Sequence, residues 1–324
     1  MTTCPLNLDD RCYCANHINT FEAAPSKTAV LLLAHGTPES PAQIPEYLGH
    51  VTAGRALPPH VIEEIRHRYS LIGFSPLTCW TRLQADHLSD ALKMPVFVGM
   101  RNWKPFIADA VKAISSEGFE HVIAICLAPQ NSRTSVGLYR RAVLGDTPLP
   151  FTLDFVEEWH DQPGLAKAFA EKLQTNWKNA SAQHGEKLPI IFTAHSVPQR
   201  TITEGDPYEA QAKETAELVA KEAGLSTPDW TFAFQSQGMS GGPWIGPTVE
   251  ETIVALNAKG HRGVFLQPVG FLCDHVEVLY DIDIAFRQFA EKQGMHLWRA
   301  ESLNGSQLLT AALAELVRSR IALK

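Results

Sequence analysis

The chain has 324 residues, which is enough for two domains, and its 45% hydrophobic and 19% charged residues are typical of a soluble globular protein. A formal net charge of −7 argues against a general nucleic-acid-binding protein, which would carry a basic patch or stripe. No apolar run approaches the roughly 20 residues of a membrane span, and the N-terminus lacks an apolar signal segment, so we expect a cytoplasmic protein.

The first 26 residues are predicted to form a tail that precedes the folded part of the chain. Three of the six cysteines lie here, at Cys4, Cys12 and Cys14, with His17 close by. Their spacing matches no standard zinc or iron–sulfur pattern. We therefore expect no iron–sulfur cluster and no tightly bound cofactor.

Apolar runs and helical periodicity alternate along the rest of the chain. We predict strands at 29–34, 94–100, 121–129, 149–159, 189–193, 230–235, 263–267 and 296–299. We predict helices at 42–49, 59–69, 105–116, 165–176, 207–223, 249–259, 276–284 and 306–321, with another that ends near 92. The stretches 130–141 and 236–247 are predicted to be loops.

This alternation is typical of α/β proteins that have parallel sheets flanked by helices. We predict a first domain over 27–150, joined by the C-terminal helix within 304–324, and a second domain over 151–303. No composition-biased linker separates the two.

A short motif occurs twice, as AHGTP at 34–38 and AHSVP at 194–198. Each copy follows an apolar run, so His35 and His195 are each predicted to lie at the end of a buried parallel strand. Ligands of open α/β sheets bind just beyond the carboxyl ends of the strands. The repetition indicates a duplicated α/β unit with a ligand between its halves.

The segment 269–283, VGFLCDHVEVLYDID, places acidic residues directly after an apolar run. If 276–284 is helical, Glu277 and Asp281 lie on one face, where a divalent metal would relieve their repulsion. A solvated helix N-terminus, where acidic residues are favoured, is the alternative. His195 and Glu277 together would suit a metal of borderline softness such as Fe²⁺.

The common hydrolase and nucleotide-binding signatures are missing from the chain. There is no H-E-x-x-H, G-x-S-x-G or Walker A sequence, and no G-x-G-x-x-G follows the first strand. The apolar and aromatic segment 59–80 includes Arg68, Tyr69 and Ser75, a mixture that suits a flat apolar ligand with carboxylates at its rim. A surface helix with salt bridges is the other interpretation of this segment.

Seven motifs in this order resemble the ferrochelatases, which insert Fe²⁺ into a porphyrin. They are AHGTP, RHRYSLIGFSPL, LAPQNS, TAHSVPQR, EGDPYEAQ, FQSQGMSGGPWIGP and PVGFLCDHVEVLYDID, and they span most of the chain after the tail. AHGTP and LAPQNS are most similar to the coproporphyrin III ferrochelatases. The resemblance implies two Rossmann-like, chelatase-type domains with the porphyrin in the cleft between them.

The resemblance also implies roles for individual residues. His195 and Glu277 match the catalytic pair that binds iron or takes the pyrrole protons, and Asp281 continues an acidic metal path. The residues implied to bind the porphyrin are His35, Arg68, Tyr69, Ser75 and His160.

The chain departs from the family pattern at several of these positions. The closest relatives usually have Tyr at the position of His35, where the phenol ligates product iron, so we predict His35 as the axial ligand. A porphyrin-contacting Arg of the family falls at Thr52, with Arg55 three residues away. Ala285 replaces an acidic residue that extends the metal-binding helix in some relatives.

The expected function is therefore insertion of ferrous iron into coproporphyrin III in haem biosynthesis. Protoporphyrin IX as substrate, a cobalt or nickel chelatase, and a non-catalytic haem carrier are the alternatives. By analogy with the family, we expect a monomer that makes transient contact with a downstream haem-synthesis enzyme.

Overall fold

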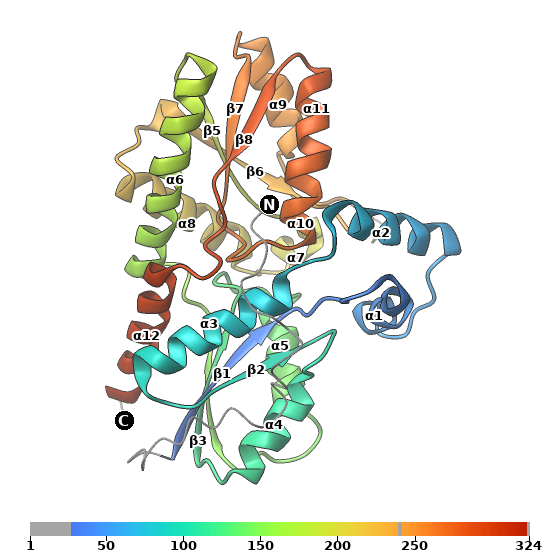
Figure 1. Ribbon diagram of the computed structural model, residues 1–324, viewed down its shortest axis with the longest axis vertical. Helices are drawn as coiled ribbons and strands as arrows, with labels where there is room; N and C mark the ends of the chain where they lie inside the picture. The colour runs from blue at the N-terminus through green and yellow to red at the C-terminus, as the bar shows by residue number, and fades with distance from the viewer. Residues whose placement is uncertain (1–26, 239–241, 323–324) are drawn as a thin grey trace.

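The computed structural model describes residues 27–238 and 242–322 (Figure 1). The cysteine-containing tail predicted for 1–26 lies outside the described residues. Two four-stranded parallel sheets form the framework. The first has the order β2-β1-β3-β4 and comprises β1 (Thr28–Ala34), β2 (Val96–Met100), β3 (His121–Cys126) and β4 (Thr152–Val156). The second has the order β6-β5-β7-β8 and comprises β5 (Ile190–His195), β6 (Trp230–Gln235), β7 (Gly263–Pro268) and β8 (His296–Arg299).

The two sheets have the same topology. In each, the strand that comes first in the sequence, β1 or β5, occupies the second position of the sheet. All seven residues of β1 and all six of β7 are buried. Strands buried on both faces are expected when helices cover both sides of a parallel sheet. The predicted α/β fold with two helix-flanked parallel sheets is confirmed, and the shared strand order agrees with the duplicated histidine motif.

Helices connect the strands and cover the sheets. Those of the first half are α1 (Ile44–Val51), α2 (Pro59–Ile72), α3 (Leu77–Leu92), α4 (Ile107–Ser116) and α5 (Val136–Leu144). The others are α6 (Pro163–His184), α7 (Gln199–Thr203), α8 (Tyr208–Glu222), α9 (Val249–Ala258), α10 (Val276–Leu279), α11 (Arg287–Lys292) and α12 (Gln307–Ala322). Their ends follow local chemistry: α2 ends at Gly73 with a φ of 67°, and Thr248 and Glu251 form a capping box at the start of α9.

Three predictions about the elements were wrong. The strand predicted at 149–159 was assigned to the second half, but β4 pairs with β3 and completes the first sheet. The loop predicted at 130–141 contains the start of α5, whose Val136, Tyr139 and Val143 are buried on one helical face. The single helix predicted at 276–284 is instead α10 followed by a π-helix, Asp281–Phe286.

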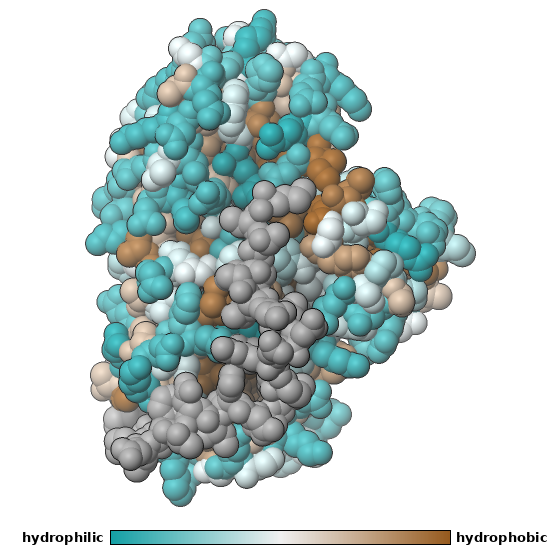
Figure 2. All heavy atoms as spheres, in the orientation of Figure 1, coloured by the Kyte–Doolittle hydropathy of each residue, from teal (hydrophilic) through white to brown (hydrophobic). Residues whose placement is uncertain are grey.

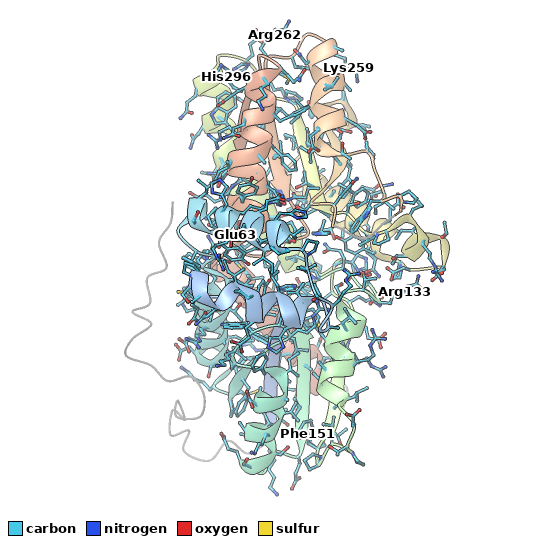
Figure 3. All side chains as sticks on the ribbon, turned by 90° about the vertical axis from the view of Figure 1, so that its right-hand side faces the viewer. Glu63, Arg133, Phe151, Lys259, Arg262 and His296 are labelled. Atoms are coloured by element: carbon cyan, nitrogen blue, oxygen red, sulfur yellow. The ribbon has the colours of Figure 1, made fainter. Side chains whose placement is uncertain are left out.

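The carboxyl ends of both sheets face the middle of the molecule. Arg262 and His296, at the starts of β7 and β8, lie at the upper end in Figure 3, and Phe151, directly before β4, lies at the lower end. All eight strands are parallel to their neighbours within their sheet. The loops that follow the strands therefore meet at the waist of the molecule, which α1 and α2 cross (Figures 1 and 3).

A single hydrophobic cluster joins the two halves. It includes Leu32 of β1 and Ile125 of β3 together with Phe192 of β5, and Phe169 of α6 packs among them. The C-terminal helix α12 adds Leu313 to the same cluster. It lies against α3 and α6, and Arg318 donates a hydrogen bond to the carbonyl of Ala91 at 3.0 Å. Within the described residues, none of the helices is long and apolar enough to span a membrane.

Candidate functional site

Each copy of the histidine motif lies at the carboxyl end of the first strand of its half. His195 is the last residue of β5, and His35 directly follows β1. The backbone carbonyl of His195 accepts a hydrogen bond from the Tyr208 hydroxyl at 2.8 Å. Because both strands end at the waist, both imidazoles lie where a ligand of parallel sheets would bind.

Glu277 lies between two imidazoles. Its Oε1 is 3.3 Å from Nε2 of His195, and its Oε2 is 3.2 Å from Nε2 of His275. The Nδ1 atoms of these histidines face the carbonyls of Ser196 and Cys273, so each Nδ1 donates to a backbone oxygen. This arrangement directs both Nε2 atoms at one carboxylate.

The protonation of the pair follows from this geometry. Removal from water lowers the pKa of His195, but the charge and hydrogen bond of Glu277 outweigh this effect and leave the pKa above its usual value of 6.5. Burial opposes ionisation of Glu277, yet His195 and His275 hold the pKa of this carboxyl well below 4.5. The mutual effect of the two groups therefore favours an imidazolium beside a carboxylate.

Asp281 is a second carboxylate near the His195–Glu277 pair. It begins the π-helix and accepts a hydrogen bond from the Ser236 hydroxyl. Burial raises the pKa of Asp281 to about 6, although the Ser236 hydrogen bond opposes that shift. The charges of Glu277 and Arg68 also act on Asp281, so these three residues lie within electrostatic reach of one another.

His35 lies across the waist from the Glu277 group, close enough for Glu277 and His275 to affect its pKa. The pKa of His35 is lowered to about 4, mainly because the ring is removed from water and secondarily because of the positive charge of Arg101. Its Nδ1 is 3.1 Å from the Gly36 carbonyl, and Asn102 Nδ2 is 2.9 Å from its Nε2. His35 is therefore a neutral imidazole at physiological pH.

The predicted segment Arg68, Tyr69 and Ser75 borders the same site. Arg68 forms an ion pair with Glu64, and its guanidinium carbon is 5.1 Å from the ring centroid of Tyr280. Tyr69 is only 3% exposed and its hydroxyl accepts from Thr37 at 3.3 Å, so it packs beneath the site. Ser75 Oγ lies 3.4 Å from the backbone nitrogen of Leu77 at the start of α3.

His160 has a different environment from the other predicted residues. It is buried beside α8, and its Nε2 is 2.9 Å from Glu214 Oε2. No contact joins it to the Glu277 group within the described part of the chain. Tyr139 does lie near the site, and its ring centroid is 5.6 Å from the guanidinium carbon of Arg101.

The sequence analysis missed Arg101, Asn102 and Tyr139. Arg101 and Asn102 follow the end of β2, and their backbone amides donate to the carbonyls of Ala34 and His35 at 3.0 and 2.9 Å. Polar residues at the end of a predicted strand were a usable signal for these two. For Tyr139, the signal was the helical spacing of the buried face of α5.

Apolar groups line the remaining walls. The ring centroids of Trp244 and Phe271 are 6.3 and 6.5 Å from that of His195. Val276 packs against the cluster that contains Tyr47, Tyr69 and Trp103. Figure 2 shows apolar surface where α2 adjoins the upper half of the molecule, and Leu71 near the end of α2 is 44% exposed. An apolar ligand would match this lining.

Comparisons with known proteins agree on one family. The family model described as Ferrochelatase matches residues 27–321. A protein named "Ferrochelatase" from Acidobacterium capsulatum is 55% identical over 308 residues, which cover 90% of this chain and 94% of that protein. A "Coproporphyrin III ferrochelatase" from Geobacillus sp. (strain WCH70) is 33% identical over 314 residues, which cover 93% of this chain and 100% of that protein.

The likeness to solved structures concerns the fold. A structure described as "SirB from Bacillus subtilis with Fe3+" superposes with a TM-score of 0.55 at 12% identity, and covers 91% of this chain and 95% of the other. This similarity supports a two-domain chelatase fold.

Proposed function

Because this chain belongs to the ferrochelatase family, we propose that the porphyrin into which it inserts Fe²⁺ is coproporphyrin III. Metal insertion into a porphyrin is the activity of the family. The names of the relatives divide between the general and the coproporphyrin-specific forms. The choice of porphyrin therefore has to be argued from the charges in the site.

The environment of Arg101 is the observation that favours coproporphyrin III as the substrate. It lies beside His35 and Tyr139, with its Nε buried and without a hydrogen-bond partner. Within residues 27–238 and 242–322, no carboxylate is within ion-pair distance of its guanidinium. A partly buried cation without an anionic partner is costly, and a ligand carboxylate would offset that cost.

The substituents of the two porphyrins make this difference relevant. Coproporphyrin III carries a propionate on every pyrrole ring, whereas protoporphyrin IX carries vinyl groups on two of its rings. In our proposal Arg101 binds one propionate inside the cleft, and Arg68 binds another near Tyr280. Arg68 already pairs with Glu64, so it contributes less than Arg101.

The reaction exchanges two pyrrole protons for one ferrous ion. We infer that Glu277 and Asp281 attract the cation, because the charges of both carboxylates act on His195. Fe²⁺ near Glu277 would remove the negative charge that raises the pKa of His195. His195 would then release its proton to solvent and accept the two pyrrole protons one after the other, passing the first to solvent before it takes the second.

The apolar and aromatic walls would hold the ring and exclude water. Binding energy from the propionates at the rim would support a bent ring whose nitrogen lone pairs are accessible to the metal. His35, on the opposite face, would ligate the iron of the product.

Anaerobic metal insertion tests this proposal, with Fe²⁺ and either coproporphyrin III or protoporphyrin IX, followed by loss of free-porphyrin absorbance. We expect faster turnover with coproporphyrin III. In Arg101→Met, kcat/KM for coproporphyrin III should fall about tenfold or more, since a charge-assisted hydrogen bond is lost. Arg200→Met, which removes an arginine whose side chain is 86% exposed, is the matched control.

The alternatives predict different outcomes. A preference for protoporphyrin IX would overturn the choice of substrate and leave the family activity in place. Absence of insertion into either porphyrin, together with tight binding of the iron product, would favour a haem carrier. A monomeric state and contact with a downstream enzyme stay predictions.

A further inference from the structure

The two nitrogens of the His35 ring have opposite hydrogen-bonding roles. Nδ1 lies 3.1 Å from the Gly36 carbonyl, an acceptor only, so Nδ1 carries the hydrogen. The Tyr47 hydroxyl is 3.3 Å from the same nitrogen. A neutral imidazole with Nδ1–H has its single lone pair on Nε2. Asn102 Nδ2 lies 2.9 Å from this atom and donates to it.

The opposite orientation of the Asn102 amide is disfavoured. It would direct Oδ1 at the ring and require the hydrogen on Nε2. The Nδ1 lone pair would then face the lone pairs of the Gly36 carbonyl at 3.1 Å. The carbonyl of Gly36 thereby determines both the tautomer of His35 and the orientation of the Asn102 amide.

Asn102 is held firmly in this position. The residue is only 3% exposed, and its backbone amide donates a hydrogen bond to the carbonyl of His35 at 2.9 Å. The next residue, Trp103, is also 3% exposed and packs directly on Gly36. The Asn102 amide therefore has little freedom to leave Nε2 unless another group competes for the lone pair.

We propose that Asn102 is a positioning residue that occupies the Nε2 lone pair of His35 until iron in the product displaces it. This inference rests on the proposed role of His35 as axial ligand. A metal ion bound by His35 before insertion would be held on the wrong face of the ring. The hydrogen bond from Asn102 weakens capture of free Fe²⁺ there and also weakens the bond to product iron, which favours release.

The ring tautomer provides the first test, and it needs neither porphyrin nor metal. Nitrogen NMR of protein labelled at histidine should show His35 with Nδ1 protonated and Nε2 bare, with the signal assigned by its loss in His35→Ala. In Asn102→Asp, the new carboxylate can only accept, so Nε2 should also gain a hydrogen while Nδ1 keeps its own. Protonated Nε2 in the unaltered protein would overturn the proposal.

Product affinity provides the second test. Titration with ferric coproporphyrin III, followed by visible absorbance, should show binding about fivefold tighter in Asn102→Leu, as expected when one competing hydrogen bond is removed. Gln84→Met is the matched control, because Gln84 is another buried amide that donates to a backbone carbonyl, that of Asn304. This control should bind the product as the unaltered protein does. Unchanged or weaker binding in Asn102→Leu would contradict the proposal.

The two tests separate this inference from the proposed function. If the tautomer and the tighter binding are found but no iron is inserted, the role of Asn102 stands and the enzymatic activity fails. If iron is inserted normally while His35 carries its hydrogen on Nε2, the activity stands and the role of Asn102 fails.

Discussion

At the scale of single residues, Glu277 couples the chemistry of the site because one carboxylate faces both His195 and His275. The short sequence separation of Glu277 and His275 made their proximity predictable. His195 is 82 residues away in the chain, and only the arrangement of β5 beside the segment after β7 brings it within 3.3 Å. The family motifs predicted that His195 and Glu277 act together, but the distance between them could be known only from the fold.

The first prediction concerns the base. His195→Ala should reduce iron insertion by about a hundredfold or more, the typical contribution of a positioned acid or base. Porphyrin binding, measured by fluorescence quenching, should change little, because the rim residues remain. His184→Ala, which removes an imidazole at the end of α6, is the control. Near-normal turnover in His195→Ala would eliminate the assigned role.

The second prediction concerns the proton on His195. An NMR titration should give this imidazole a pKa above 6.5, and Glu277→Gln should move the pKa below 6.5, because removal from water then acts without the opposing carboxylate. Iron insertion in the unaltered protein should rise with pH through the pKa of His195. A pKa that does not respond to Glu277→Gln would show that another group charges the ring.

The sign of the effect on stability follows from the two shifts. The raised pKa of His195 gives a contribution that is complete below 6.5 and is lost as the pH rises through the folded-state value. The depressed pKa of Glu277 gives a contribution that is present above 4.5 and is lost as the pH falls through its folded-state value. The pair therefore stabilises the fold most strongly between pH 4.5 and 6.5.

At the scale of elements, the turn after β1 determines where His35 lies. Gly36 has a φ of 85°, and a Cβ there would lie 2.7 Å from the backbone nitrogen of Trp103. The glycine lets the chain turn sharply and lets the loop after β2 approach β1 closely. This contact explains the glycine of the AHGTP motif in physical terms.

The third prediction tests that turn. Gly36→Ala should lower the free energy of unfolding by about 2 kcal/mol or more, since left-handed strain and a steric clash act together. Gly118→Ala is the control, because Gly118 has a similar φ of 76° and open space around its Cβ position. Chemical denaturation of both variants measures the difference. Equal losses would show that the loop after β2 moves aside without cost.

At the scale of the whole molecule, buried polar contacts connect the two halves at the waist. Gln130, after β3, donates to the Thr215 hydroxyl at 3.0 Å and to the Val269 carbonyl at 3.1 Å. The backbone amide of Asn131 donates to Gln211 Oε1 at 2.6 Å. Thr215 and Gln211 belong to α8, so these bonds hold the loop of the first sheet against the second half.

The fourth prediction tests this connection. Gln130→Met should lower the free energy of unfolding by about 1–3 kcal/mol, because the buried carbonyl of Val269 loses its side-chain donor. It should also raise KM for the porphyrin, which binds between the halves in our proposal. Gln174→Met, which alters an exposed amide that donates to Ala223, is the control. A stability loss no greater than that of the control would argue against the connection.

Most of the helices and strands, and the family, could be predicted from the amino-acid sequence. Continuous apolar runs such as 29–34 predicted buried parallel strands, since burial on both faces requires apolar residues throughout. The repeated histidine motif predicted a ligand at the carboxyl ends of two such strands, and the family motifs pointed to His195 and Glu277.

Strand pairing and long-range contacts could not be predicted, because local sequence patterns do not specify them. The sequence of β4, TLDFV, does not specify which sheet the strand joins, so only its pairing with β3 showed where it belongs. Hydrogen bonds between residues distant in the chain, such as Asn102 with His35, depend on how strands are ordered side by side. The role of a polar side chain depends on the group that it faces, and that group is specified by the whole fold.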